Sequence, residues 1–359
     1  MASRKPLTLT ALSLLVLFFA STASGRELEQ LSIVGIPVDP KMQIVLGNAW
    51  ALYLSGHIDS DAAGRLENYI LQNKVPRESS VILDSPGGSL YGGMALGNII
   101  RKYRLRTDVG ARKANATRTF EYDAGGCYSA CTLAYVGGSF RFLHDGSHFG
   151  IHRFAFSSPP ENGIDVAQVA SASIVAYLRS MDIDTDLFTL STVAGPTEIY
   201  EPSLQELQKL NVVTNGFNKP KWTIESNNGI LYLKGERDTV YGINKFIMFC
   251  PPKSGMVLHL IFDAQGHDKE LLSFPAHSLV IDGQEYPITS AWKKIENGWF
   301  NSEYSLTTQQ LLAIGRAKSV GVIVQGGYGA PVFLGFDSLP FEDGAKKLVG
   351  LLNSCSFAQ

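Results

Sequence analysis

The sequence predicts an α/β fold for its N-terminal half and a smaller β-rich domain after it. In the first 215 residues, apolar runs typical of buried strands alternate with segments whose apolar residues recur at helical spacing. The composition changes at residues 215–220, Asn-Gly-Phe-Asn-Lys-Pro, which is typical of a linker. Short strand-like runs separated by turns dominate the rest of the chain. We therefore expect two domains, residues 26–215 and 216–359, and a mostly parallel sheet in the first.

The expected elements of the first domain follow from these patterns in order. Residues 43–56 and 80–84 read as strands, and Asp59 or Ser60 can cap the helix that lies between them. That helix carries its apolar residues on one face: Ala63, Leu66, Ile70 and Leu71. The further elements expected here are a helix at 89–103, a strand near 105–109, a short helix after residue 129, strand-like runs at 140–142 and 149–152, and helices at 163–180 and 203–210.

The second domain is expected to consist mainly of strands. Turns such as Asn227-Asn228-Gly229, Asp282-Gly283 and Glu296-Asn297-Gly298 separate some of its apolar runs. The expected strands lie at 221–225, 230–234, 245–250, 256–262, 279–281, 322–324 and 332–336, and a terminal helix lies at 342–352.

The first 25 residues read as a secretory signal peptide. Arg4 and Lys5 precede an apolar run at 7–20, and small residues at 21–25 offer a cleavage site. An uncleaved membrane anchor is the alternative, because the run is nearly long enough to span a bilayer. Removing the signal takes two basic residues from 31 and no acidic residue from 33, which leaves a formal charge of −4. That balance argues against a nucleic-acid partner. We expect a periplasmic or secreted protein with no membrane association after cleavage.

The chain has four cysteines, an even number that suggests disulfides in an oxidising compartment. Cys250 follows a strand-like run and Cys355 ends the last helix. A bridge between them would close a loop of roughly 100 residues and stabilise the fold by ~4 kcal/mol. Cys127 and Cys131 can pair if the backbone between them is not a regular helix, and two buried thiols are the alternative. No histidine lies at ligand spacing within that turn, so we expect neither a metal nor another cofactor.

The segment 125–131, Gly-Gly-Cys-Tyr-Ser-Ala-Cys, can hold a nucleophilic serine, Ser129, at the start of a short buried helix. A serine hydroxyl needs a base to take its proton. His152 is the proposed base and later acid, because imidazole titrates near neutrality. His144 and His148 are rivals, and His148 shares a strand face with His152. The structural alternatives are an N-cap role for the serine and a core role for the histidine.

The strand at 81–84 runs into the turn Ser85-Pro86-Gly87-Gly88-Ser89. Glycine lets a substrate approach the backbone closely. We expect Gly87 or Gly88 to offer one N–H to the oxyanion of an acyl-transfer reaction, and Ala130 to offer the second. A tight turn without any ligand is the alternative, since Pro-Gly-Gly is common in turns.

The segments 54–58, 84–89, 127–131 and 150–152 resemble, in order and spacing, the ClpP-type serine peptidases. Within the ClpP/crotonase superfamily, the similarity is greatest to the predicted periplasmic ClpP-like proteins of bacteria, and it covers roughly residues 40–215. The resemblance implies a ClpP/crotonase-like fold for the first domain. It also implies that Ser129 is the nucleophile, that His152 is the base, and that the Gly-Gly turn lines a groove for a substrate strand.

The acid that would orient His152 has no strict match to the aspartate of ClpP-type enzymes. Glu198 falls nearest to that position, and a glutamate can orient a histidine from a slightly different backbone placement. A surface carboxylate is the alternative role for Glu198. The other candidates for the acid are Asp182, Asp184 and Asp186, or no acid at all.

Two functions fit these observations. The first is an exported serine peptidase acting on short or unstructured peptides, because energy-dependent unfolding is improbable outside the cytoplasm. The second is a catalytically silent module that binds an extended peptide in the same groove by strand addition. A Ser-Lys dyad is disfavoured, because no lysine lies between Lys113 and Lys209. Residues 153–181 match the insertion through which ClpP-type domains form rings, so the resemblance also allows a homo-oligomer.

Overall fold

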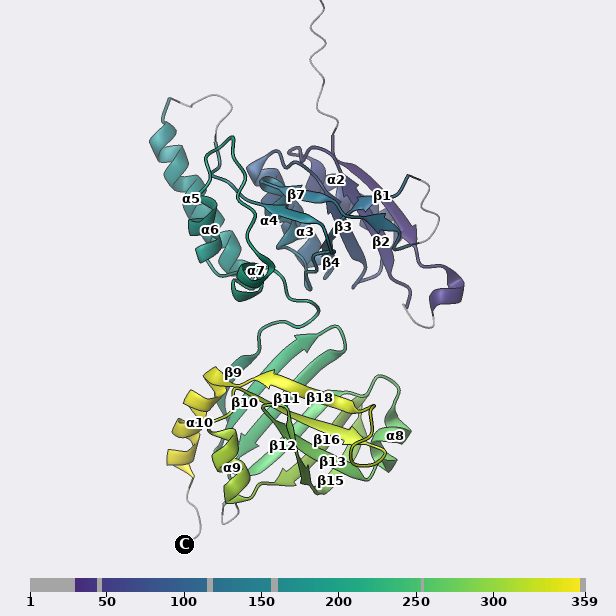
Figure 1. Cartoon of the computed structure of the whole chain (residues 1–359), viewed down its shortest axis with the longest axis vertical. Coiled ribbons are helices and arrows are strands. Elements are labelled where there is room, and N and C mark those ends of the chain that lie inside the picture. Colours follow the sequence, from purple (N-terminus) through teal and green to yellow (C-terminus); the bar gives the residue numbers. More distant parts are fainter. Residues whose placement is uncertain (1–29, 44–46, 115–118, 156–160, 253–254, 356–359) are drawn as a thin grey trace, which may run out of the picture.

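The computed structural model describes residues 30–43, 47–114, 119–155, 161–252 and 255–355. The protein is a mixed α/β structure with several sheets, shown in Figure 1. The expected signal peptide, residues 1–25, lies outside the described residues. Within these ranges no helix is both long enough and apolar enough to cross a membrane.

A four-stranded sheet, ordered β1-β2-β3-β4, lies at the centre of the N-terminal part. Its strands are β1 (Ser32–Pro37), β2 (Trp50–Ser55), β3 (Ser80–Asp84) and β4 (Arg106–Val109). β2, β3 and β4 run parallel, as the alternation of strands and helices predicts, whereas β1 pairs antiparallel with β2. The strand expected at 43–56 begins only at Trp50, because residues 47–48 form a turn. The sequence does not reveal β1, since Gly35 and Pro37 interrupt its apolar pattern.

Two helices of this part lie close to their expected positions. α2 (Ala62–Asn73) buries one face, formed by Ala62, Leu66 and Ile70. Leu71 was expected on that face but is 59% exposed, because it lies about 100° further around the helix than its buried neighbour. Asp59 does not cap α2; Asp61 takes the N-cap position and donates its N–H to the Asp59 carboxylate at 2.9 Å. α3 (Leu90–Lys102) covers almost the whole expected range of 89–103.

Short elements make up the rest of the N-terminal part. They are β5 (Ala111–Arg112), β6 (Tyr122–Asp123), β7 (Gly126–Tyr128), α4 (Ala130–Tyr135), β8 (His148–Gly150), α5 (Gly163–Ser180), α6 (Asp186–Ser191) and α7 (Leu204–Lys209). β7 and β8 form a parallel pair. The strand expected at 140–142 is wrong, since this segment makes only one isolated bridge, between Thr107 and Arg141. The Arg141 guanidinium donates to the carbonyls of Gly138, Asn211 and Val212 in the neighbouring loops.

The C-terminal part is built from two antiparallel sheets, ordered β15-β16-β12-β11-β10-β9 and β14-β13-β17-β18 (Figure 1). The strands are β9 (Lys221–Asn227), β10 (Ile230–Thr239), β11 (Gly242–Phe249), β12 (Val257–Asp263), β13 (Ala276–Ile281), β14 (Gln284–Ile288), β15 (Ser290–Glu296), β16 (Trp299–Ser305), β17 (Ser319–Gln325) and β18 (Leu334–Pro340). The helices are α8 (Asp268–Ser273), α9 (Thr308–Ile314) and α10 (Glu342–Ser354). The sequence does not predict β14, β15 or β16, because polar residues interrupt the apolar pattern of each.

Buried apolar side chains form two large clusters, one on each side of the expected linker. The first draws on residues between 31 and 213, and the second on residues between 222 and 351. An ion pair joins the two parts, with 3.2 Å between Arg104 Nη2 and Asp238 Oδ2. The separate clusters agree with a domain boundary after residue 215, which stays a prediction.

Both expected disulfides are present in the structure. Cys127–Cys131 joins β7 to α4, and its two Cα atoms are 5.2 Å apart. Cys250–Cys355 joins the chain just after β11 to the end of α10, with 5.8 Å between the Cα atoms. The alternative of two buried free thiols at 127 and 131 is therefore wrong.

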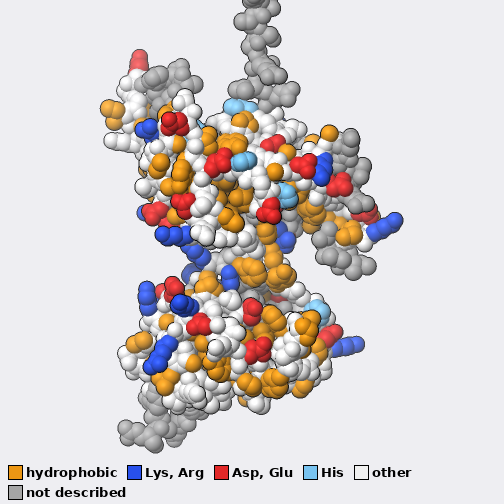
Figure 2. All heavy atoms as spheres, viewed as in Figure 1, with side chains coloured by type: hydrophobic (Ala, Val, Ile, Leu, Met, Phe, Trp, Pro, Cys, Tyr) orange, Lys and Arg blue, Asp and Glu red, His pale blue; other side chains and the backbone are white. Residues whose placement is uncertain are grey.

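Acidic and basic side chains are interspersed over the face seen in Figure 2. The whole chain is nearly balanced, with 31 basic and 33 acidic residues. This face therefore presents no broad basic surface, and the expectation that the protein has no nucleic-acid partner stays a prediction.

Candidate active site

Ser129 lies in the sharp turn between β7 and α4. Its backbone has φ 55° and ψ −125°, a conformation that residues with a side chain rarely adopt. The Ser129 N–H donates to the Gly150 carbonyl at 2.9 Å, and its own carbonyl accepts the Thr132 N–H at 2.9 Å. Such a conformation costs about 1–3 kcal/mol and persists only where the surroundings hold it. The turn resembles the strained strand-to-helix turns that present nucleophilic serines.

The Ser129 side chain takes no part in capping α4. Although Ser129 occupies the N-cap position, its hydroxyl makes no capping hydrogen bond in the part of the chain described. The first turn of α4 instead uses the Thr132 hydroxyl, which donates to the Ser129 carbonyl at 2.7 Å. A structural N-cap serine would accept a backbone N–H from that turn. The observed geometry therefore leaves the hydroxyl for another role.

Gly87 and Gly88 bring a second backbone turn against Ser129. Their φ angles are +100° and +144°, which glycine adopts readily and other residues do not. A Cβ on Gly87 would lie 2.8 Å from the Ser129 Cβ and 2.6 Å from the Tyr128 carbonyl oxygen. A Cβ on Gly88 would collide with the Ile58 carbonyl oxygen. Both positions need glycine, and its small size lets this turn lie beside the serine.

Two of the three expected oxyanion donors can offer an N–H to a substrate. The Gly87 N–H is already used, since it donates to the Ser85 hydroxyl at 3.1 Å. Gly88 pairs with Ile58 in a parallel β-bridge, in which the residues before and after Gly88 make the backbone hydrogen bonds to Ile58. The N–H of Gly88 itself therefore faces away from Ile58. Ala130 is the first residue of α4, and an N–H at that position has no acceptor within its helix. The geometry therefore favours Gly88 and Ala130 as donors.

Ser129 lines a cavity of about 290 Å³ that also reaches Gly88, Ala130 and His152. Most of the remaining wall is apolar and comes from α3, α4, α5, α6 and the segment after β8: Leu90, Leu133, Ile151, Phe154, Ile174, Leu178, Leu187 and Phe188. The structure thus brings four of the predicted site residues together. The cavity beside them suits an apolar side chain.

His152 follows β8, and its hydrogen bond fixes the tautomer of the neutral ring. Nδ1 lies 2.8 Å from the Arg153 carbonyl oxygen, which can only accept a hydrogen bond. Nδ1 must therefore carry the proton in the neutral ring, and Nε2 is left as a proton acceptor. Among the described residues, no hydrogen bond joins His152 to Ser129. The two side chains share a cavity wall without direct bonding.

The structure separates His152 from its two rivals. His148 Nδ1 lies 2.9 Å from Glu201 Oε2, and this pair borders other hollows of the surface rather than the cavity of Ser129. The His144 ring packs against Tyr122, with 5.0 Å between the ring centres. Only His152 among the three lines the cavity of Ser129. Strand periodicity could not make this distinction, because β8 ends at Gly150, before His152.

Among the described residues, no hydrogen bond or ion pair joins Glu198 to His152. The Glu198 side chain is exposed, and its carboxylate accepts the Gly195 N–H at 3.0 Å. None of the other acidic candidates lines the cavity: Asp182, Asp184 and Asp186. Across the described ranges, no carboxylate is bonded to His152. The Arg153 carbonyl takes the place at Nδ1 that an acid occupies in a Ser-His-Asp triad.

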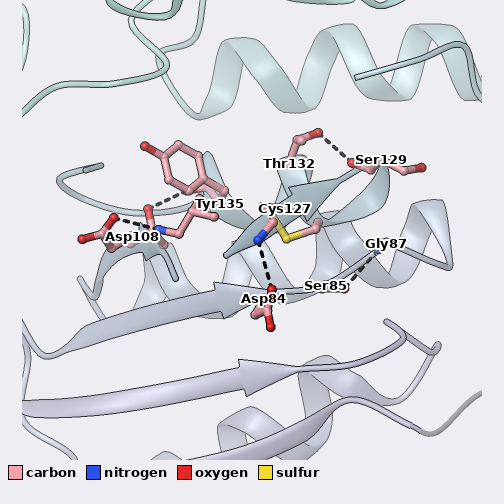
Figure 3. The surroundings of a disulfide bond; sticks show 12 residues. Asp84, Ser85, Gly87, Asp108, Cys127, Ser129, Thr132 and Tyr135 are labelled. Carbon is pink, nitrogen blue, oxygen red and sulfur yellow. Dashed lines mark hydrogen bonds between the residues drawn. A yellow bond between two sulfur atoms is a disulfide. The ribbon is translucent and has the colours of Figure 1, made fainter. Parts of the chain in front are cut away.

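The Cys127–Cys131 disulfide lies directly under the Ser129 turn (Figure 3). β7 is fastened to the end of β3 on the other side, since the Gly126 N–H donates to the Asp84 carboxylate at 3.0 Å. The Ser85 N–H also donates to the Gly126 carbonyl at 2.7 Å. The strand that leads into the serine is therefore held both by the sheet and by a covalent bond.

Some parts of the site carry no signal in the sequence. The Arg153 carbonyl orients His152, and a backbone acceptor cannot be recognised from residue types. The cavity wall from α5 has a weak signal, because Ile174 and Leu178 repeat at helical spacing. Helical spacing predicts burial but not whether the buried face lines a core or a cavity. No group of three or more His, Cys, Asp or Glu residues within the described ranges could hold a metal ion.

No protein-family model matches this chain. No curated protein matches it either. Among solved structures, a mutant of ClpP1 from Listeria monocytogenes matches 45% of this chain and 88% of its own, with a TM-score of 0.33 and 14% sequence identity. A likeness this weak supports no conclusion about activity, and the ClpP-type resemblance remains a hypothesis from the sequence.

Proposed function

We propose that this protein is an exported ClpP-like serine peptidase that cleaves short or unstructured peptides. One observation carries the proposal: Ser129 adopts a strained strand-to-helix conformation on the wall of a cavity that it shares with His152. Strained backbone of this kind is concentrated at functional sites. The two disulfides support export, because such bonds persist in oxidising compartments.

The proposed reaction is acyl transfer in two steps. Ser129 Oγ attacks the peptide carbonyl carbon, and its proton passes to His152 Nε2. The N–H groups of Gly88 and Ala130 stabilise the oxyanion. His152 then protonates the leaving amine, and the carbon–nitrogen bond breaks to leave an ester on Ser129. A water molecule, deprotonated by His152, hydrolyses this ester and restores the serine.

The Arg153 carbonyl replaces the usual acid in this scheme. It fixes the tautomer of His152, which is one of the two tasks of the aspartate in a triad. A carbonyl carries no full charge, so it stabilises the imidazolium less than a carboxylate does. We therefore expect slow turnover. The apolar cavity wall, which includes Leu90 and Phe188, would accept an apolar side chain of the substrate next to the cleaved bond.

A second function is favoured by a different observation. No hydrogen bond joins Ser129 to His152 in the described structure, and no carboxylate supports the histidine. These features suit a catalytically silent module that binds an extended peptide along the Gly88 turn by strand addition. Catalytic hydrogen bonds often tighten only once substrate is bound, so the peptidase remains the first proposal.

Labelling with a fluorophosphonate probe separates the two functions, because only an activated serine reacts with it. The oxidised mature protein would be tested beside Ser129→Ala and His152→Ala, with His148→Ala as the matched histidine control. Labelling of the wild type and of His148→Ala, but of neither site variant, would support the peptidase. A folded wild-type protein that takes up no probe would favour the binding module.

A further inference from the structure

We infer that the Cys127–Cys131 disulfide positions the Ser129 hydroxyl, so that the serine is poised for attack only in the oxidised chain. The inference rests on the proposed function, since it concerns the reactivity of the same serine. It assigns to the two cysteines a positioning role, beyond their contribution to stability.

The disulfide spans the strained residue from both sides. Cys127 belongs to β7 and Cys131 to α4, and Ser129 lies midway between them. Four residues of extended strand would separate the two Cα atoms by about 13 Å, and four residues of helix by about 6 Å. The observed separation is 5.2 Å, far below the extended value although Cys127 lies in a strand, so the chain turns between β7 and α4. The covalent bond therefore holds closed the turn that gives Ser129 its conformation.

The disulfide also joins this turn to the core. Both cysteines are fully buried and belong to the apolar cluster of the N-terminal part. Bonded sulfurs are about 2 Å apart, whereas two unbonded thiols must move apart to their van der Waals separation. Reduction would push residues 127 and 131 apart inside a close-packed interior. Ser129 has the strained positive φ among the residues between them, and this strain can then relax.

The remaining contacts at Ser129 hold it less completely. Its N–H bond to Gly150 and its carbonyl contacts with Thr132 lie on separate sides of the turn. Gly87 limits the space at the Ser129 Cβ but makes no bond to it. None of these contacts links the strand side of the turn to the helix side. The disulfide does so directly, which makes it the element that fixes the serine relative to Gly88 and Ala130.

The second disulfide supplies a matched control. Cys250–Cys355 has a similar Cα separation of 5.8 Å but lies in the C-terminal part, which has its own apolar cluster. Removing this disulfide should lower the free energy of unfolding without changing the conformation of Ser129. A comparison of the two pairs therefore separates a positioning effect from a general loss of stability.

The experiment compares wild type with Cys127→Ala/Cys131→Ala and Cys250→Ala/Cys355→Ala. The first readout is fluorophosphonate labelling, resolved into the binding constant of the probe and the rate constant of the covalent step. We expect the covalent step to slow about 10- to 100-fold in the 127/131 variant, because a displacement near 1 Å has effects of that size. Probe binding should stay within about twofold, since most of the cavity wall comes from residues outside the turn. The 250/355 variant should react like wild type.

The second readout does not depend on activity. Hydrogen exchange would be followed in the peptide that covers residues 126–136, where the Ser129 and Thr132 N–H groups are bonded. Exchange there should accelerate in the 127/131 variant and not in the 250/355 variant. If the alanine variant does not fold, Cys127→Val/Cys131→Ala refills the space left by the sulfurs.

These readouts distinguish the failure of the inference from the failure of the proposed function. Wild-type labelling with an unchanged covalent rate in the 127/131 variant would overturn the positioning role and leave the peptidase intact. An unlabelled wild type would remove the peptidase, and the exchange measurement would then decide alone. Unchanged exchange at residues 126–136 would overturn the inference in either case.

Discussion

His277 illustrates how burial and a nearby charge set the protonation state of a single residue. It lies in β13, only 3% exposed, and its Nδ1 is 2.7 Å from the Tyr304 hydroxyl. Burial, and to a smaller extent the nearby positive charge of Lys293, lower the pKa of His277 to about 4. The neutral ring is therefore the form that the folded chain accepts.

We expect this histidine to make stability depend on pH. The unfolded chain binds the proton at about pH 6.5, and the folded chain only near pH 4. The free energy of unfolding should thus be highest above pH 6.5 and should fall by up to ~3 kcal/mol between pH 6.5 and 4. Urea unfolding across this range would measure the change, and His277→Gln should flatten it. Equal slopes for the variant and the wild type would show that other groups carry the effect.

Arg141 is a second residue whose role follows from its surroundings. It is 1% exposed, and its guanidinium donates to the carbonyls of Gly138, Asn211 and Val212 at 2.7–2.8 Å. Burial lowers the pKa of Arg141 to about 10, yet the three carbonyls compensate the buried charge. This one side chain ties the segment after α4 to the segment after α7.

Arg141→Lys should destabilise the protein by about 2–4 kcal/mol, because an ammonium cannot reach three carbonyls in one plane and leaves some of them unpaired. Urea unfolding of the purified variant would measure this loss. Lys102→Ala is the matched control, since Lys102 forms an exposed ion pair with Glu67 whose loss should change the free energy of unfolding little. A loss equal to that of the control would contradict the proposed role of Arg141.

At the scale of the elements, two glycines, one in a turn and one in a helix, should change the stability in opposite directions when replaced by alanine. Gly88 lies in the turn beside Ser129 at φ +144°, and a Cβ there would meet the Ile58 carbonyl. Gly64 is exposed within α2, and a Cβ there would meet nothing within 4 Å. The same substitution is thus blocked at one site and free at the other.

Gly64→Ala should stabilise the protein by about 0.5–1 kcal/mol, because alanine loses less backbone entropy in a helix. Gly88→Ala should lower the free energy of unfolding and remove most of the fluorophosphonate labelling, since the strained turn must shift. Thermal unfolding and labelling of both variants would test this pair. Full labelling of Gly88→Ala would argue against the turn as part of the site.

The elements also show where sequence patterns succeed. α3 and α5 are long and amphipathic, and they lie within one residue of the ranges expected from the sequence. β14, β15 and β16 are not predicted: β14 and β15 lie at sheet edges, and β16 buries the polar residues Asn301 and Ser302, so none shows a regular apolar pattern. A strand of this kind is specified by its neighbours in the sheet, which the local sequence does not contain.

At the scale of the whole molecule, the Cys250–Cys355 bond should matter most for stability. The two residues are 105 positions apart in the sequence and join the chain just after β11 to the end of α10. Closing such a long loop restricts the unfolded chain and should stabilise the fold by ~4 kcal/mol. The Cys250→Ala/Cys355→Ala variant should therefore melt at a clearly lower temperature in calorimetry. An unchanged melting temperature would mean that the terminal helix docks without the bond.

The sequence by itself predicted the alternation of strands and helices, the Cys250–Cys355 pairing and the turns that carry Ser129 and Gly88, and it left open whether Cys127 pairs with Cys131. These features follow from local spacing, from the even number of cysteines and from residue types that only certain turns accept. Only the tertiary structure decided that His152 and not His148 shares a cavity with Ser129, and that the Arg153 carbonyl rather than Glu198 faces the histidine. The reason is physical. Which side chains meet in a cavity depends on how segments far apart in the sequence pack together, and a local sequence pattern carries no information about that packing.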